Sequence, residues 1–338
     1  MPTLAAYFDT SGVSFLLKKD EKNIEFFKFP YVYSKGTLGN QCSEQDFYQG
    51  IIEKFLAENN VKKSCDVVVS GFPKPPQIGL EPKFSAGMED LVDNSESHYP
   101  VITDGNSLVA PGVGNYFSIA DEEVFRKDIN SGSNFINNLS IFPQIISNDI
   151  AVQGEIDKEL VEKAPSDLVI DSKKPVLFGG GRFSKDRGDD ELIPILILSM
   201  LKKAGIYNVA LDRNNTFPLA QSMKMYDKSF LIGIDEYLES LGTFICPGGS
   251  VECLVKSDVG EDQFIELEKE RICAFPLKTE IPTKIQIKSR ALGTVNVQTC
   301  GGELGLVFDT RVVRQDIYSN VKLFNECVKQ FGKGIKAE

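Results

Sequence analysis

Histidine is almost absent from this sequence of 338 residues, which contains only His98. A zinc site built on histidine, or a Ser-His-Asp triad, would therefore have to be centred on that one residue. His98 lies in the polar segment 94–100, Asn-Ser-Glu-Ser-His-Tyr-Pro, whose composition is typical of a surface loop. We expect an exposed loop histidine and predict neither kind of site.

Long apolar runs and a Cys-X-X-Cys pair are also lacking. No window of 18 apolar residues occurs, so no transmembrane helix is expected. The first residues do not show the basic-then-apolar layout of a signal peptide. The seven cysteines are odd in number and lie in apolar segments, which favours reduced, partly buried thiols. We therefore predict a cytoplasmic protein.

Positive charge is in deficit, with 37 Lys and Arg against 48 Asp and Glu, and the formal net charge is −11. A phosphate backbone would be repelled by such a molecule, so we expect no nucleic-acid partner. Hydrophobic residues make up 42% and charged residues 25% of the chain, as in an ordinary globular protein. The composition therefore excludes a disordered or fibrous chain.

The first 99 residues have the pattern of an α/β lobe followed by an irregular, proline-containing connection. Short apolar runs separated by turn residues predict a β-meander, and a 3.6-residue apolar rhythm after Ser43 predicts a helix capped by that serine. A buried strand follows the helix. The expected meander strands are residues 4–8, 13–17 and 24–29, the expected helix is 43–59, and the expected strand is 66–72.

Residues 100–241 are predicted to form a second α/β lobe. It begins with a hairpin over residues 101–110. A strand over 176–178 leads through a glycine turn into a long helix that ends at Gly205, and a strand at 208–212 and a helix at 217–224 follow.

Beyond residue 241 the pattern changes to short runs rich in Val, Ile and Thr. These runs predict a β-rich domain over residues 242–312, with a barrel as one form of it. Residues 313–331 then carry an apolar stripe at helical spacing, which predicts a packed amphipathic helix within the tail 313–338.

Three turns in these lobes could carry chemistry. The first is Asp9-Thr10-Ser11-Gly12, the second is Asp104-Gly105-Asn106, and the third is Gly179-Gly180-Gly181-Arg182. Backbone N–H groups in such turns can hold phosphate, and a carboxylate at a strand end can hold hydrated Mg²⁺. The third turn matches neither the Rossmann nor the P-loop pattern. Their order along the chain is the layout of the two-lobed actin-like ATPase fold.

Several segments of the second half resemble the glutamate mutase-associated MutL family, which is distinct from the mismatch-repair protein of the same name. They are Pro-Val-Leu-Phe-Gly-Gly-Gly-Arg-Phe-Ser at 175–184, the strand region 205–213, and Leu-Gly-Thr-Phe-Ile-Cys-Pro-Gly-Gly-Ser at 241–250. The most specific is Gly-Gly-x-x-Gly-Leu-x-x-Asp-x-Arg at 301–311. The resemblance is best over residues 134–312, whereas residues 1–133 match in layout.

That family belongs to the actin, sugar-kinase and heat-shock-chaperone superfamily, so the resemblance implies an α/β, two-lobed actin-like (ribonuclease H-like) ATPase fold with a β-rich C-terminal domain. It implies ATP and Mg²⁺ as ligands. Asp9 and Asp104 would face the metal. The other expected contacts are Thr10, Ser11 and Gly12 at one phosphate turn, Gly105 and Asn106 at the other, Gly179, Gly180 and Gly181 near the adenosine, and Arg182 on the base or a phosphate.

The first two turns depart from the family pattern in ways that bear on activity. Ser11 stands where glycine is expected, and the second turn lacks the usual Gly-Gly-x-Thr-Thr run. A Cβ in place of hydrogen hinders close phosphate approach, and missing hydroxyls remove donors. We therefore expect a divergent nucleotide-binding protein that acts through a protein partner, with weak or lost ATPase activity.

Two other hypotheses remain open from the sequence. One is a non-catalytic actin-like scaffold of a membrane-associated assembly, like the pilus-assembly platform proteins of the PilM type. The other is a sugar kinase, for which no acceptor-site signature is recognisable, so that only fold analogy supports it.

Overall fold

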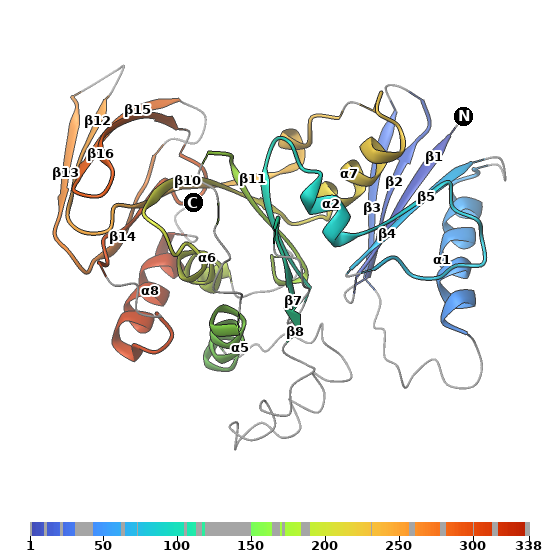
Figure 1. Cartoon of the computed structure of the whole chain (residues 1–338), viewed down its shortest axis with the longest axis horizontal. Helices are drawn as coiled ribbons and strands as arrows, with labels where there is room; N and C mark the ends of the chain where they lie inside the picture. Colours follow the sequence, from blue (N-terminus) through green and yellow to red (C-terminus); the bar gives the residue numbers. More distant parts are fainter. Residues whose placement is uncertain are drawn as a thin grey trace.

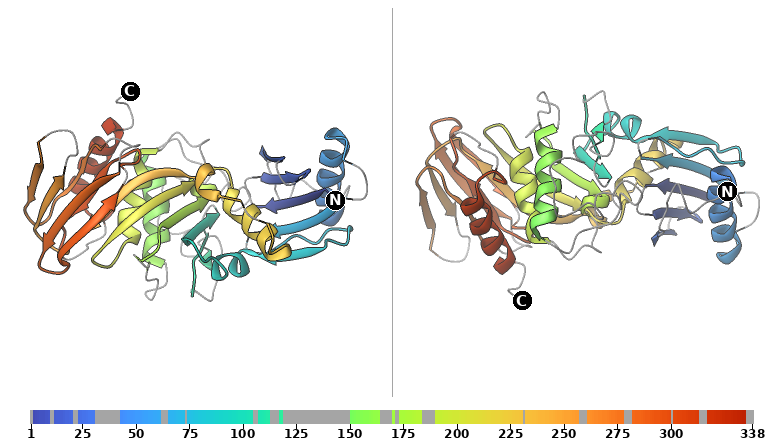
Figure 2. Two further views of the ribbon diagram at one scale, coloured as in Figure 1. Left: turned by 90° about the horizontal axis from the view of Figure 1, so that it is seen from above. Right: turned by 90° about the horizontal axis from the view of Figure 1, so that it is seen from below.

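Over the residues that it describes, the computed structural model has a mixed α/β architecture with three β-sheets (Figure 1). The sheets follow one another along the long axis of the molecule, as both views in Figure 2 show. We call them the N-terminal sheet, the central sheet and the small sheet. The structure describes residues 2–9, 12–20, 23–30, 43–61, 65–72, 74–104, 107–112, 117–118, 150–163, 170, 173–183, 190–230, 232–256, 261–277, 282–299, 301–312 and 317–334.

The N-terminal sheet has five strands in the order β3-β2-β1-β4-β5. β1 pairs antiparallel with β2 and parallel with β4, which in turn pairs parallel with β5. The expected meander is confirmed by the antiparallel β1–β2–β3 pairing. The strands are β1 (Thr3–Phe8), β2 (Gly12–Lys18), β3 (Ile24–Pro30), β4 (Asp66–Gly71) and β5 (Phe84–Gly87).

Helix α1 (Glu44–Glu58) covers one face of this sheet, and its predicted cap is confirmed. The Ser43 hydroxyl accepts a hydrogen bond from the backbone N–H of Asp46 at 3.1 Å, which satisfies one of the unpaired donors at the helix start. Phe55 of α1 stacks on Phe15 of β2 with ring centroids 4.2 Å apart. The alternation of side chains along each strand leaves the other face for α7 (Thr216–Tyr226) and α2 (Met88–Asp93).

The central sheet has eight strands in the order β14-β17-β11-β10-β9-β6-β7-β8. Helices α5 (Ile150–Lys163) and α6 (Ile193–Met200) pack on one face of it (Figure 1). The strands are β6 (Tyr99–Asp104), β7 (Ser107–Val109), β8 (Phe117–Ser118), β9 (Val176–Gly180), β10 (Gly205–Asp212), β11 (Glu239–Cys246), β14 (Ile272–Phe275) and β17 (Leu306–Asp309).

Part of the central sheet repeats the strand order of the N-terminal sheet. Its segment β8-β7-β6-β9-β10 has the first strand in the middle, antiparallel to the second and parallel to the fourth. β9 and β10 are again parallel. The two consecutive sets of five strands, β1 to β5 and β6 to β10, are therefore arranged in the same way.

The segment 242–312 differs from the single β-rich domain expected from the sequence. It is shared between two sheets, and the expected boundary at residue 242 falls inside β11. Short alternating runs predict strands but do not specify which strands pair. The small sheet, in the order β13-β12-β15-β16, contains β12 (Val251–Lys256), β13 (Gln263–Leu267), β15 (Thr283–Ser289) and β16 (Gly293–Thr299).

Two helix boundaries also differ from expectation. The helix after the glycine turn is α6, which is short, and Gly205 begins β10 instead of ending a helix. The last helix is α8 (Val321–Gly334), packed beside α6 through Phe331 and Cys327; residues 313–316 lie outside the described part. Within the described residues, the structure has no helix with the length and apolarity needed to cross a membrane.

Candidate functional site

Three of the sequence-predicted residues lie at the carboxyl ends of strands, whereas Gly12 begins β2. Asp9 directly follows β1, Asp104 ends β6, and Gly180 ends β9. Both carboxylates are buried. Four further predicted residues, Thr10, Ser11, Gly105 and Asn106, lie outside the described residues.

A third carboxylate, Asp212 at the end of β10, was not singled out from the sequence. Its side chain accepts hydrogen bonds from the backbone N–H groups of Thr216 at 2.8 Å and Phe217 at 2.7 Å, at the start of α7. Burial raises the pKa of Asp212, although these N–H groups and Lys28 act in the opposite direction. The sequence did contain a signal for this residue, because Asp212 lies between a predicted strand and a predicted helix, and acidic side chains are favoured at helix N-termini.

Asp9 is joined to the turn after β10 by Asn215. The Asn215 Nδ2 donates to Asp9 Oδ2 at 3.0 Å and to Ser14 Oγ at 3.1 Å. The other carboxylate oxygen of Asp9, Oδ1, accepts the backbone N–H of Gly12 at 2.9 Å. The Asp9 carboxylate therefore links the N-terminal sheet to the turn that follows β10 of the central sheet.

The end of β9 continues this link toward Asp104. In the strand register Gly179 is paired with Asp212 on one side and with Ile102 on the other. Gly180 has φ +90° and is paired with Thr103, so an added Cβ would overlap the Thr103 carbonyl. The glycines thus allow close backbone packing of strands that end beside Asp104 and Asp212.

The third glycine and Arg182 begin the short 3-10 helix η3 (Gly181–Phe183), where both are buried. Arg182 makes a two-point ion pair with Asp157 of α5, with Nε to Oδ1 at 2.8 Å and Nη2 to Oδ2 at 2.7 Å. Gln153 donates to the same carboxylate at 3.0 Å. In the structure the Arg182 guanidinium is therefore buried and bound to Asp157. The resemblance implied a contact with the base or a phosphate instead.

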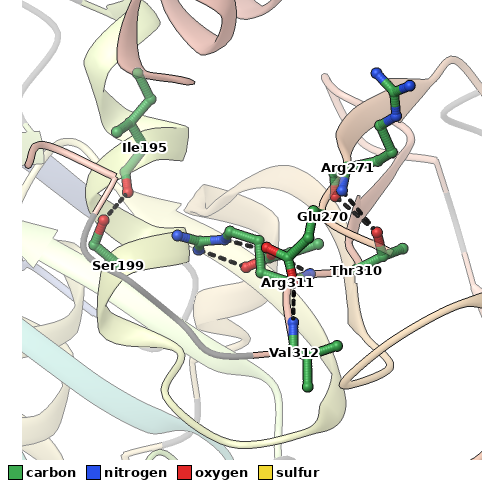
Figure 3. Close-up of polar contacts among 8 residues, drawn as sticks. Ile195, Ser199, Glu270, Arg271, Thr310, Arg311 and Val312 are labelled. Atoms are coloured by element: carbon green, nitrogen blue, oxygen red, sulfur yellow. Dashed lines mark hydrogen bonds and ion pairs between the residues drawn. The ribbon is translucent and has the colours of Figure 1, made fainter. Parts of the chain in front are cut away.

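The most specific motif of the resemblance, residues 301–311, also forms part of the interior. Arg311 holds the Asp309 carboxylate through Nε at 2.8 Å and Nη2 at 2.6 Å, with both side chains buried (Figure 3). Glu270 accepts the N–H of Val312 at 3.0 Å beside this pair. Gly305, at φ +74°, lies so close to the backbone of Phe275 that a Cβ would collide with it. This motif joins β17 to β14.

Asp9 and Asp104 have the oxygen ligands that a hydrated Mg²⁺ takes in sites that it shares with phosphate. Mg²⁺ in such sites needs one or two carboxylates and keeps several waters, and Asp9 and Asp104 are carboxylates at the ends of corresponding strands in the repeated arrangement. In the part of the chain described here, no group of three or more His, Cys, Asp and Glu side chains is placed to hold a metal by itself. A metal there would therefore need further ligands besides these side chains.

Comparisons with known protein families, with curated proteins and with solved structures give no match to this chain.

Proposed function

We propose that this chain is a divergent actin-like protein that acts through contacts with a protein partner and binds Mg·ATP weakly at the strand ends around Asp9 and Asp104. The observation that carries the proposal is the repeated strand order, β3-β2-β1-β4-β5 and β8-β7-β6-β9-β10. A central first strand, antiparallel to the second and parallel to the fourth, is the arrangement of a ribonuclease H-like domain, and the actin-like fold contains two of these.

The connection between the carboxyl ends of β1, β10, β9 and β6 supports the position of the proposed site. The hydrogen bond from Asn215 to Asp9 connects the first sheet to the end of β10, and the register of β10, β9 and β6 leads from there to Asp104. Ligands of α/β proteins bind at the carboxyl ends of parallel strands. In this proposal Asp9 and Asp104 would hold the hydrated metal, and the turns at Gly12 and Gly105 would hold phosphate.

The contacts of the same residues support weak binding of a ligand. Both oxygens of Asp9 already accept protein N–H groups, and Arg182 is committed to Asp157. A ligand would have to compete with these hydrogen bonds, each of which is worth about 0.5–3 kcal/mol. When bound, Mg·ATP would supply a charged group that contacts both lobes.

A thermal-unfolding measurement with Mg·ATP tests the proposal. With a Kd of ~1 mM, about 10 mM ligand stabilises the protein by about 1.4 kcal/mol, and the melting temperature rises by roughly 2 °C or more. The rise should require Mg²⁺, disappear in Asp104→Asn and persist in Glu261→Ala, an exposed carboxylate control. A melting temperature that does not respond to Mg·ATP would refute nucleotide binding.

A scaffold without nucleotide is the second candidate. It is favoured because Asp9 is hydrogen-bonded to Asn215 and Arg182 forms an ion pair with Asp157, so both side chains already have partners within the protein. It predicts that a partner captured by the full chain is retained by Asp104→Asn and is insensitive to added Mg·ATP. The nucleotide-binding proposal predicts that partner affinity changes with Mg·ATP in the original protein and not in this variant.

A further inference from the structure

A cavity of about 350 Å³ opens on the central sheet, on the face opposite α5 and α6, and none of the sequence-predicted site residues lines it. It is bounded by β10, β11, the end of β16, the 3-10 helix η5 (Ile234–Tyr237) and His98 just before β6. Figure 1 shows the small sheet on one side of this face and α7 on the other. The volume is in the range of pockets that hold small molecules.

The pattern of side chains along β10 and β11 explains why this space is not filled. Ile206 packs under the small sheet and Ala210 packs toward α7, so that Asn208 lies between two hydrophobic cores. The pairing of β10 with β11 shifts between Val209 and Ala210. Bulges of this kind are common beside binding sites, and the short side chains here, Ala210 and Ser240, leave room on this face.

The inner wall of the cavity is polar and already hydrogen-bonded. The Thr243 hydroxyl donates to Asn208 Oδ1 at 2.9 Å and is in contact with the Thr299 hydroxyl. His98, only 4% exposed, holds Asp235 through Nε2 at 3.1 Å and Ser97 through Nδ1 at 2.9 Å. The expectation of an exposed loop histidine is therefore wrong, because η5 folds over this residue.

The rim of the cavity carries polar groups that are available to a ligand. The Asn208 oxygen is used by Thr243, whereas its amide nitrogen has no hydrogen-bond partner among the described residues. Exposed Ser240 and Gln298 add a hydroxyl and an amide, and exposed Asp235 adds a carboxylate. The remaining wall is apolar, with Val209 and Leu238 among its residues.

We propose that this cavity binds a neutral, polyhydroxylated small molecule of about the size of a pyranose sugar. Such a ligand has hydroxyls for Asn208, Ser240 and Gln298 and a C–H face for the apolar wall. An anion is disfavoured because neither lysine nor arginine lines the cavity and Asp235 lies at its rim. An apolar ligand would leave these polar groups without partners.

The aromatic content of the wall distinguishes a sugar from a nucleobase. No phenylalanine, tyrosine or tryptophan lines the cavity in the described part of the chain. The ring of His98 is almost completely buried and is held by Asp235 and Ser97, so it offers little face on which an unsaturated base could stack. A saturated ring with several hydroxyls needs no such partner, since hydrogen bonds fix its orientation. This inference does not depend on the nucleotide proposal, because the two use different residues.

Saturation-transfer NMR and calorimetry with D-glucose, D-galactose and D-mannose test the inference on the full chain. We expect at least one of them to bind with a Kd of about 10 mM or lower, a weak affinity in keeping with so few polar contacts. Glucose 6-phosphate should bind at least about fivefold more weakly, since its charge meets Asp235. Asn208→Leu should lower the affinity about fivefold or more, as expected for loss of a hydrogen bond.

A blocking variant and its matched control complete the test. Ser240→Trp places a bulky ring at the rim and should reduce binding at least about tenfold. Ser85→Trp, at an exposed position of β5 in the N-terminal sheet, should leave binding unchanged. The proposal is overturned if none of the three sugars binds at about 50 mM. It is equally overturned if Ser240→Trp binds as the original protein does, or if the phosphate ester binds as tightly as the neutral sugar.

Discussion

Asn215 donates a hydrogen bond from Nδ2 to Oδ2 of Asp9 at 3.0 Å, although the two residues belong to different halves of the chain. Asn215 has φ +58°, in the left-handed region that asparagine tolerates better than most side chains. In the chain Asn215 lies between Asp212 and α7, and the Asp212 carboxylate accepts hydrogen bonds from the first N–H groups of that helix. This contact fixes α7 against the N-terminal sheet, whose other face is covered by α1.

Two substitutions of Asn215 distinguish what its hydrogen bonds contribute to stability from what its backbone conformation contributes. Asn215→Ala loses both hydrogen bonds and strains the backbone, so we expect the free energy of unfolding to fall by about 2–4 kcal/mol. Asn215→Gly loses the same bonds without the strain and should be about 1–2 kcal/mol less destabilised. Urea denaturation measures both, and equal losses would argue against the strained conformation.

Glycine substitutions test the close packing of β9 on β6. In Gly180→Ala the new Cβ meets the Thr103 carbonyl and φ is positive, so we expect a loss of about 3 kcal/mol or more. Gly50 is an exposed glycine within α1 with open space around it, and Gly50→Ala should stabilise the protein by about 0.5–1 kcal/mol. Thermal unfolding of the two variants gives the comparison, and a tolerated Gly180→Ala would contradict this strand register.

The ion pair of Arg182 and Asp157 predicts a large and strongly coupled effect. Arg182→Met leaves a buried carboxylate without its cation and should cost about 3–5 kcal/mol. Adding Asp157→Leu should recover part of that loss, because no uncompensated charge then remains. A double-mutant cycle in urea measures the coupling. Additive losses would mean that the two side chains do not interact.

We expect the burial of His98 to make the stability of the protein depend on pH. Burial lowers the pKa of His98 below its usual value of about 6.5, and the Asp235 carboxylate opposes this shift. The unfolded chain therefore binds this proton more readily than the folded protein does. The contribution of neutral His98 to stability is complete above about pH 6.5 and is lost as the pH falls from there toward the pKa of the folded state. The free energy of unfolding should decrease by at most about 1.4 kcal/mol per pH unit in this range.

Because the chain has one histidine, the Hε1 signal of the imidazole in proton NMR reports its pKa without ambiguity of assignment to another histidine. Asp235→Asn removes the opposing charge and should lower that pKa further. His98→Gln should abolish the loss of stability just below pH 6.5. A folded-state pKa at or above about 6.5 would contradict the buried placement.

The sequence was sufficient for features that depend on local pattern. Ser43 and Asp46 mark the start of α1, and the N-terminal meander follows its turn residues. The predicted strand 176–178 forms most of β9, which continues through Gly179 and Gly180. Placing Asp9, Asp104 and Gly180 at strand ends needed only this local pattern. These features follow from capping, turn chemistry and side-chain alternation.

Contacts between distant segments could not be predicted in this way. His98 is buried by η5, and Arg182 is paired with α5, whose position depends on the packing of the central sheet. Asp212 looks like an ordinary helix cap in the sequence, and only the fold places Asn215 beside Asp9. The division of residues 242–312 between two sheets likewise depends on strand pairing, which short alternating runs leave open.

The most direct test of the nucleotide proposal is a crystal structure of the full chain with Mg²⁺ and a non-hydrolysable ATP analogue. The account predicts electron density for the phosphates and metal between the ends of β1 and β6, within reach of Asp9 and Asp104. Density confined to the cavity beside His98, or no bound nucleotide together with an intact Asn215–Asp9 hydrogen bond, would contradict it.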